Sequence, residues 1–349
     1  MAIGFGIIGC GMIAKFHARA IRDVKGARLV GCYNRTLDKA AALAAEFGGE
    51  PTTDLDSMLA RPDIDVVTIC TPSGAHMEPA IAAAKAGKHV IVEKPLDVTL
   101  KRCDAMIAAC EKAGVKLGTI FPSRFHKSSQ LLKRAVEEGR FGQLTLGDAY
   151  VKWFRTQAYY DSGAWRGTWK LDGGGALMNQ AIHSVDLLIW LMGPVVEVTA
   201  HTATLAHERI EVEDVAAATL RFASGALGVI EATTAAYPGS LKKIELSGSH
   251  GMAVLEEESI IKWQFAKMNK RDEQLIAEMQ DRTKTGGGAA DPAAIGHQAH
   301  AELFREFVEA VKAGKNPNLD GSEGRRSVEL ILAIYKSAKT GKAVKLPLK

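Results

Sequence analysis

Short β-branched runs alternate with alanine-rich amphipathic stretches from Ala2 to about Pro122. This alternation predicts a doubly wound parallel sheet, because consecutive parallel strands need a crossover helix between them. The expected strands are Ile3 to Ile8, Arg28 to Tyr33, Val66 to Cys70, His89 to Val92 and Lys116 to Ile120. The expected helices are Met12 to Arg22, Leu37 to Phe47, His76 to Ala86 and Leu100 to Ala113.

The pattern changes after Pro122, where β-rich runs dominate. These runs favour an antiparallel sheet, and they are Leu144 to Phe154, Val195 to Thr204, Val215 to Phe222, Ala226 to Thr234, Lys243 to Ser247 and Met252 to Glu256. Helices are expected at Ser128 to Glu138, Gly175 to Met192, Ala299 to Ala313 and Ser322 to Ala338. The Gly- and Ala-rich stretch Thr283 to Pro292 predicts a mobile surface loop.

The length of 349 residues exceeds what one hydrophobic core usually organises. We therefore predict an α/β protein of two domains. Residues 1–122 form a Rossmann domain with a doubly wound parallel sheet, and residues 123–349 form an α+β domain with a large, mainly antiparallel sheet.

Charge and cysteine content narrow the classes of partner. The formal charge of +4 is spread along the chain, which argues against nucleic acid and membrane partners. The five cysteines form no CxxC pair, so reduced thiols are expected rather than a disulfide framework or a zinc site. No leader precedes the first strand, and no apolar run reaches the roughly 18 residues that span a bilayer, so we expect a cytoplasmic protein.

A glycine-rich turn joins the first expected strand to the first helix. In Gly9-x-Gly11-x-x-Ala14, the first glycine permits the tight turn, the second lets backbone amides approach a pyrophosphate, and Ala14 allows close helix packing. Gly9, Gly11, Met12 and Ile13 are thus expected to bind NAD or NADP.

The second expected strand ends at Asn34-Arg35, where an acid would bind the adenosine ribose of NAD. Neutral Asn34 does not repel a 2′-phosphate, and Arg35 could pair with one or stack on the adenine. An alternative is that Arg35 is a solvated surface charge. Both cofactors fit, with NADP slightly favoured.

Glu93-Lys94-Pro95 directly follows a strand, at the carboxyl edge where open α/β sheets bind ligands. There the Lys94 ammonium could hydrogen-bond a substrate oxygen whose charge changes. The peptide before Pro95 can be cis at modest cost. Alternatively, Lys94 simply solvates the end of the strand.

A second set of polar residues shares one face of the helix after Gly175, at α-helical spacing: Asn179, His183, Asp186 and Trp190. Asn179 or Asp186 could orient the His183 imidazole. His183, with an ordinary pKa near 6.5, suits the role of general base better than Lys94, which becomes the electrostatic partner. No His or Cys cluster completes a metal site there, so no metal is expected.

Aromatic and basic residues crowd the segment Trp153 to Asp172. Aromatic faces suit sugar rings and arginines suit carboxylates or phosphates, so Tyr160, Trp165 and Arg166, together with Arg124, are predicted to bind substrate. The same residue types are enriched at subunit contacts, which is the alternative.

Taken together, these motifs resemble the Gfo/Idh/MocA family of sugar oxidoreductases. The resemblance covers essentially the whole chain and rests on the Gly9 loop, Thr71-Pro72 with His76, Glu93-Lys94-Pro95, and GGGALMNQAIHSVD from Gly173 to Asp186. It implies that Lys94 and His183 are the catalytic pair and that Thr71, Pro72, His76 and Glu93 lie near the cofactor. It also implies that the second domain binds substrate and forms a homodimer or homotetramer through its sheet.

One position departs from the family pattern. Many members carry an acid four residues before the histidine, where this chain has Asn179. An amide can bind a sugar hydroxyl but cannot take its proton, so Asn179 is expected to bind substrate and His183 to carry more of the acid–base role. The WRGTW and GGGALMNQ stretches resemble the branch of UDP-linked aminouronate 3-dehydrogenases.

The leading functional hypothesis is reversible oxidation of a secondary hydroxyl on a sugar or sugar derivative, such as a nucleotide-linked or uronic-acid sugar. One alternative is an NAD-dependent glycosidase that oxidises its sugar transiently. Another is a non-catalytic dinucleotide-binding regulator, against which the presence of both Lys94 and His183 argues.

Overall fold

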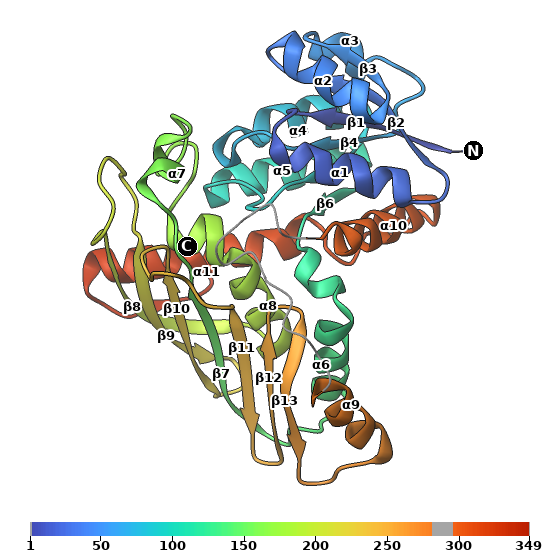
Figure 1. The fold of residues 1–349 in the computed structure, drawn as a ribbon. Helices are drawn as coiled ribbons and strands as arrows, with labels where there is room; N and C mark the ends of the chain where they lie inside the picture. The colour runs from blue at the N-terminus through green and yellow to red at the C-terminus, as the bar shows by residue number, and fades with distance from the viewer. Residues whose placement is uncertain (1, 281–295, 349) are drawn as a thin grey trace. The chain divides into compact units, whose positions relative to one another are not determined.

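The computed structural model describes residues 2–280 and 296–348, which fall into two compact units (Figure 1). Unit 1 comprises residues up to 122 together with 170–173 and 296–328. Of the described residues, unit 2 comprises 123–169, 174–280 and 329–348. The first unit thus gains two later segments beyond the predicted boundary at residue 122, and the loop expected at Thr283 to Pro292 lies outside the described residues.

Unit 1 is built on a six-stranded parallel sheet of order β3-β2-β1-β4-β5-β6, which confirms the doubly wound prediction. Its strands are β1 (Ile3–Ile8), β2 (Ala27–Tyr33), β3 (Glu50–Thr52), β4 (Val66–Ile69), β5 (His89–Val92) and β6 (Leu117–Thr119). The sequence analysis missed β3, which is only three residues long and contains Pro51. Every β4 residue is buried, as expected of a central parallel strand.

The helices of unit 1 are α1 (Met12–Asp23), α2 (Leu37–Phe47), α3 (Leu55–Leu59), α4 (Met77–Lys85), α5 (Leu100–Ala113) and, from late in the chain, α10 (Gln298–Lys312). A short 3-10 turn, Ser73–Ala75, precedes α4. Helix α10 packs against α1, and its Phe304 ring lies 5.8 Å from that of Phe5 in β1. This apolar contact explains why a late segment belongs to the first unit.

Unit 2 contains an eight-stranded sheet of order β13-β12-β11-β7-β10-β9-β8-β14. Its strands are β7 (Leu144–Lys152), β8 (Val195–Ala203), β9 (Val215–Phe222), β10 (Leu227–Thr233), β11 (Lys243–Gly248), β12 (Gly251–Glu256), β13 (Ser259–Phe265) and β14 (Val344–Lys345). All neighbours are antiparallel except β7 and β10, which confirms a mainly antiparallel sheet. Buried residues alternate along β9, so one face of the sheet is covered.

The helices of unit 2 include α6 (Lys127–Glu137), α7 (Gln157–Asp161), α8 (Ile182–Met192) and α9 (Lys270–Gln280). Helix α8 packs on β7 and β11. Helix α11 (Gly321–Thr340) crosses the division between the units at residue 328. In the described part of the chain, no helix combines the length and apolarity that a bilayer crossing requires.

The long helix expected from Gly175 to Met192 is wrong in its first part. Residues Ala176–Ala181 form a π-helix, and the α-helix begins only at Ile182. Because a π-helix has a wider turn than an α-helix, Asn179 does not stand in α-helical register with His183. The predicted shared face therefore holds only from His183 onward.

Candidate functional site

The turn between β1 and α1 has the features that a pyrophosphate needs. Gly9 has a φ of 94°, and a Cβ there would lie 2.9 Å from the backbone of Cys70 and Thr71, so the tight turn requires glycine. A Cβ on Gly11 would meet nothing within 4 Å, which leaves open space beside the helix start. No side chain caps α1, and its first turn contains no acid, so its amide groups suit an anion. Exposed Met12 and half-buried Ile13 follow.

Asn34 braces this loop. Its Oδ1 accepts a hydrogen bond from the Cys10 backbone N–H at 3.2 Å, and its Nδ2 donates to the Thr36 hydroxyl at 2.8 Å. No carboxylate stands at this position, while the neighbouring Arg35 is exposed. The arrangement is compatible with either dinucleotide.

Two loops at the carboxyl edge of the unit 1 sheet are joined by His76. Its Nε2 lies 3.0 Å from the Thr71 carbonyl oxygen, and its Nδ1 lies 3.0 Å from that of Pro95. His76 is only 1% exposed, so its position is that of a residue that holds the two loops together. Thr71 and Pro72 are half-buried at the same edge, and all three residues remain predicted cofactor neighbours.

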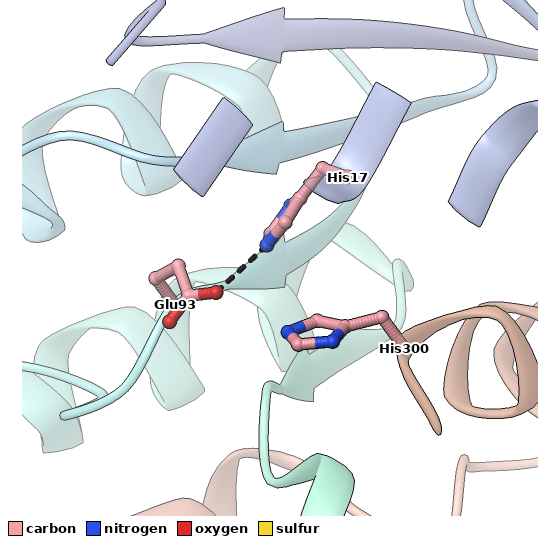
Figure 2. A group of neighbouring side chains, drawn as sticks. All are labelled: His17, Glu93 and His300. Carbon is pink, nitrogen blue, oxygen red and sulfur yellow. Dashed lines mark hydrogen bonds and ion pairs between the residues drawn. The ribbon is translucent and has the colours of Figure 1, made fainter. Parts of the chain in front are cut away.

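Lys94 is the second residue after β5 and is half-buried, and the Lys94–Pro95 peptide is cis. The neighbouring Glu93 carboxylate holds its backbone, because Oε2 accepts the Lys94 N–H at 3.0 Å. The other carboxylate oxygen lies 2.7 Å from Nε2 of His17 on α1 (Figure 2). Glu93 thus connects the predicted catalytic lysine to the helix that follows the phosphate loop.

The ionisation of Glu93 depends on this pairing. Burial alone would raise its pKa, but the hydrogen bond from His17 and the charges of His17, His300 and Lys94 hold the pKa below its ordinary value. An ionised Glu93 only accepts hydrogen bonds, so His17 Nε2 donates to it. His17 Nδ1 lies 2.7 Å from the Thr68 hydroxyl, which fixes the ring from the other side.

Among residues 2–280 and 296–348, one group of metal-ligand side chains is close enough for an ion: His17, Glu93 and His300, whose ligand atoms lie within 4.8 Å of one another. Figure 2 shows that they come from α1, the end of β5 and α10. Two ligands of a tetrahedral zinc ion stand about 3.3 Å apart. The 2.7 Å between His17 and Glu93 is instead a hydrogen-bond distance, so the observed geometry does not fit a metal.

His183 is the second residue of α8 and is half-buried. It lines a small cavity of unit 2 with Ser123, Ser184, Lys242 and Glu257. Lys242 Nζ lies 3.5 Å from Glu257 Oε2 on this wall. One turn earlier, the Asn179 amide oxygen accepts a hydrogen bond from Gln180 at 2.7 Å.

Arg124 forms a buried ion pair with Asp186. Its Nε and Nη2 donate to the two Asp186 oxygens at 2.8 and 2.6 Å, and its guanidinium lies 5.5 Å from the centre of the Trp190 ring. Arg124 is 4% exposed and Asp186 fully buried. In this arrangement both stabilise α8, and the prediction that Arg124 binds substrate has no support from the geometry.

The residues of the aromatic segment range from buried to exposed. Tyr160 is 5% exposed and its hydroxyl lies 2.8 Å from that of Thr234, so its ring is packed in unit 2, and its role in substrate binding stays a prediction. Half-buried Arg166 lies between two rings, 4.5 Å from the centre of Trp165 and 4.2 Å from that of Tyr159. Arg166 and Trp165 therefore keep the exposure that a substrate contact requires.

Several residues with a direct structural connection to the candidate site were not singled out from the sequence. Gln180 donates to the Tyr159 hydroxyl at 2.9 Å and accepts from Arg155 at 3.0 Å, which ties the aromatic segment to the π-helix. Glu213 accepts the Leu177 backbone N–H at 2.8 Å. The position of Gln180 beside Asn179 was an available signal, whereas nothing local in the sequence marks Glu213.

Comparison with known proteins agrees with both units. Residues 3–121 match the oxidoreductase family with an NAD-binding Rossmann fold, and residues 129–254 match the GFO/IDH/MocA C-terminal domain. The myo-inositol 2-dehydrogenase of Thermotoga maritima is 30% identical over 98% of each chain. The WlbA dehydrogenase of Bordetella pertussis, solved with NADH and UDP-GlcNAcA, is 38% identical with a TM-score of 0.88 over both full chains. Levoglucosan dehydrogenase, solved with NADH and levoglucosan, is 26% identical with a TM-score of 0.85, again over both full chains. The chain therefore belongs to the GFO/IDH/MocA family of oxidoreductases that bind a nicotinamide dinucleotide.

Proposed function

We propose that this protein reversibly oxidises a secondary hydroxyl of a nucleotide-linked uronic-acid sugar. The observation that carries the proposal is the half-buried Lys94, whose backbone is held at the carboxyl edge of the Rossmann sheet by the ionised Glu93. Family membership supplies the oxidoreductase class, and relatives that act on inositol and levoglucosan support a polyhydroxylated substrate. Unit 1 then binds the dinucleotide and unit 2 the sugar.

The bound nicotinamide supplies the hydride acceptor. His183 takes the proton of the substrate hydroxyl, and the Lys94 ammonium stabilises the oxygen as its charge changes. Gly9, Gly11, Met12 and Ile13 hold the pyrophosphate, and Asn34 braces their loop through Cys10. Asn179 binds a sugar hydroxyl without exchanging a proton.

Arg166 supports an acidic substrate. Its Nη1 donates to the Tyr159 hydroxyl at 2.6 Å, its guanidinium lies near the Tyr159 and Trp165 rings, and the charge of Arg155 also acts on it. Asp161 and Glu208 pair with Arg209 instead, and within residues 2–280 and 296–348 no carboxylate forms an ion pair with Arg166. Its charge is therefore available to a uronate or a phosphate. The WlbA dehydrogenase complex with UDP-GlcNAcA points to the same chemical class.

The test is turnover of a panel of free and UDP-linked sugars and uronates with NAD⁺ or NADP⁺, together with mass spectrometry of ligands that co-purify. We expect reduced cofactor to form with a UDP-linked uronate, and Arg166→Gln to raise KM for it by about tenfold or more. Turnover confined to free neutral sugars would refute the substrate class. Release of an aglycone without net cofactor reduction would instead support glycosidase chemistry.

Either dinucleotide fits the loop, with a small preference for NADP through Arg35. The preference rests on the lack of a carboxylate at Asn34 and on the exposure of Arg35. We expect Arg35→Ala to lower kcat/KM for NADP⁺ by about tenfold and to leave that for NAD⁺ within about twofold. Equal effects on both cofactors would contradict this role.

The sheet of unit 2 is the proposed contact of a homodimer or homotetramer. Leu146 of β7 and Leu227 of β10 are neighbours in register and are 40% and 49% exposed. Adjacent exposed leucines are typical of a covered surface. We expect Leu227→Lys to reduce the mass measured by light scattering to that of a smaller assembly, and an unchanged mass would exclude this contact.

The five cysteines are all free thiols, and burial raises the pKa of Cys10 and Cys110 to about 11. Protonated, unpaired thiols fit a reducing compartment. On this basis the cytoplasm is the proposed location.

A further inference from the structure

A buried carboxylate lies at the start of the π-helix Ala176–Ala181. Glu213, two residues before the start of β9, is 4% exposed. Its Oε2 accepts the Gly175 N–H at 3.0 Å, and its Oε1 accepts the Leu177 N–H at 2.8 Å. Tyr335 of α11 donates its hydroxyl to the same Oε1 at 2.9 Å.

The backbone of residues 174–176 also approaches Glu213 and Tyr335 closely. The Ala176 N–H donates to the Glu213 carbonyl oxygen at 3.0 Å. A Cβ on Gly175 would overlap that carbonyl oxygen, and a Cβ on Gly174 would overlap the Tyr335 hydroxyl. The two glycines therefore allow a close approach that no other residue type permits. We call Glu213 and Tyr335 the clamp.

The clamp occupies an electrostatically unfavourable position. Burial raises the pKa of Glu213 to about 7, because its hydrogen-bond donors are the uncharged Gly175, Leu177 and Tyr335. A glutamine or an apolar side chain would avoid that desolvation. A carboxylate at this point can accept from two backbone amides and a hydroxyl at once, and it thereby fixes the first turn of the π-helix.

The segment held by the clamp leads directly into the proposed site. The π-helix contains Asn179, and its last residue, Ala181, precedes α8 and His183. Wide turns of this kind cost hydrogen-bond geometry and need support from their surroundings.

We propose that Glu213 and Tyr335 are positioning residues, which hold the π-helix in register so that Asn179 and His183 face the substrate. This inference rests on the proposed function of Asn179 and His183. In this proposal neither clamp residue takes part in proton transfer: Glu213 accepts from the Gly175 and Leu177 amides, and Tyr335 donates to the Glu213 carboxylate.

The test compares Tyr335→Phe and Glu213→Gln with a matched control, Ser337→Ala. Ser337 is also fully buried on α11, and its hydroxyl bonds the backbone of Ala200 and Lys342 without touching the clamp. All three variants lose buried hydrogen bonds, so a general loss of stability appears in the control as well.

Two readouts on the full-length protein need no substrate. Amide hydrogen exchange of peptides covering 174–183 should accelerate by about tenfold in Tyr335→Phe, and more in Glu213→Gln. The rate of His183 carbethoxylation by diethyl pyrocarbonate, followed by mass spectrometry, should change by about threefold or more. Ser337→Ala should leave both rates within about twofold of wild type.

The inference is overturned if Tyr335→Phe gives the same exchange and modification rates as Ser337→Ala. Tyr335→Phe removes a single hydroxyl, so it keeps the test valid even if Glu213→Gln fails to fold. Normal turnover in His183→Ala would instead refute the proposed function. A failure of the positioning role and a failure of the proposed function are thus measured in separate experiments.

Discussion

Glu93 and Glu213 hold similar positions in the two units but differ in ionisation. They are 6% and 4% exposed, and each accepts a backbone N–H: Glu93 accepts that of Lys94 itself, and Glu213 that of Leu177 in the π-helix that precedes His183. The pKa of Glu93 lies below its ordinary value, whereas that of Glu213 is raised to about 7. Burial is therefore not what decides the charge of a carboxylate in this protein.

The neighbouring groups decide whether each carboxylate is charged. Glu93 bonds the His17 imidazole and lies near His300 and Lys94, whose positive charges offset the cost of burial. Glu213 meets two amides and a phenol, which donate hydrogen bonds but carry no charge. Unit 1 thus holds Lys94 with a stable anion, while unit 2 holds the π-helix with a group that titrates near neutral pH.

The largest effect is expected for Glu93→Ala. It leaves buried His17 and the Lys94 N–H without their acceptor, so the free energy of unfolding should fall by about 4 kcal/mol. Urea unfolding measures this loss. Glu46→Ala is the matched control in unit 1, because the Lys15–Glu46 pair is exposed and should contribute less than about 1 kcal/mol. Equal losses of unfolding free energy in both variants would show that the buried His17–Glu93 pair contributes no more than an exposed ion pair.

The pH dependence of stability should separate the two carboxylates. The pKa of Glu213 is raised from 4.5 to about 7 in the folded state, so the stability that its proton contributes is complete below the unfolded pKa and is lost as pH rises through 7. Glu93 has a lowered pKa, so its contribution is present above 4.5 and is lost as pH falls through its folded pKa.

Glu213→Gln has no such titration. From about pH 5 to about pH 8, its free energy of unfolding should gain about 2 to 3 kcal/mol relative to wild type. Urea unfolding across this range is the measurement. A wild-type minus variant difference that does not change with pH would mean that Glu213 stays ionised.

A smaller effect is expected for Gly175→Ala. The added Cβ would overlap the Glu213 carbonyl oxygen, and the π-helix must shift to relieve the overlap. We expect a loss of about 2 kcal/mol in the free energy of unfolding, together with faster amide exchange in 176–183. Wild-type exchange in this variant would show that the close approach does not set the position of the π-helix.

The smallest effect is expected for Tyr335→Phe, which removes one hydrogen bond from the carboxylate. The free energy of unfolding at about pH 8 should fall by about 1 kcal/mol, because the ring and its packing remain. Thermal unfolding of the variant measures it. A loss of unfolding free energy as large as that of Glu93→Ala would contradict the conclusion that the Tyr335 hydroxyl is one of several uncharged hydrogen-bond donors to Glu213.

Local patterns predicted most of unit 1 and the regular strands of unit 2. β1, β5 and α2 begin and end at the expected residues, because apolar runs and glycine or charged boundaries mark them. The position of Lys94 at the sheet edge could be predicted for the same reason, since Glu93-Lys94 follows the buried strand β5. The short β14 and β3 lack enough residues to produce a pattern.

The remaining features depend on contacts between distant segments. The sequence of the π-helix has α-helical periodicity, and it is Glu213, 36 residues after Leu177, that contacts its first turn. His300 joins His17 and Glu93 only because α10 packs on α1. The ion pair of Arg124 with Asp186, 62 residues later, likewise depends on a contact that no local pattern marks.

The most direct test of the central claim is the steady-state rate of dinucleotide reduction by Lys94→Ala and His183→Ala, measured with the sugar that the wild-type protein oxidises. Both variants should retain dinucleotide binding, and kcat should fall by about a hundredfold or more in each, because each loses a group that acts on the reacting hydroxyl. A kcat within about threefold of wild type in either variant would contradict the assignment of these two residues as the catalytic pair.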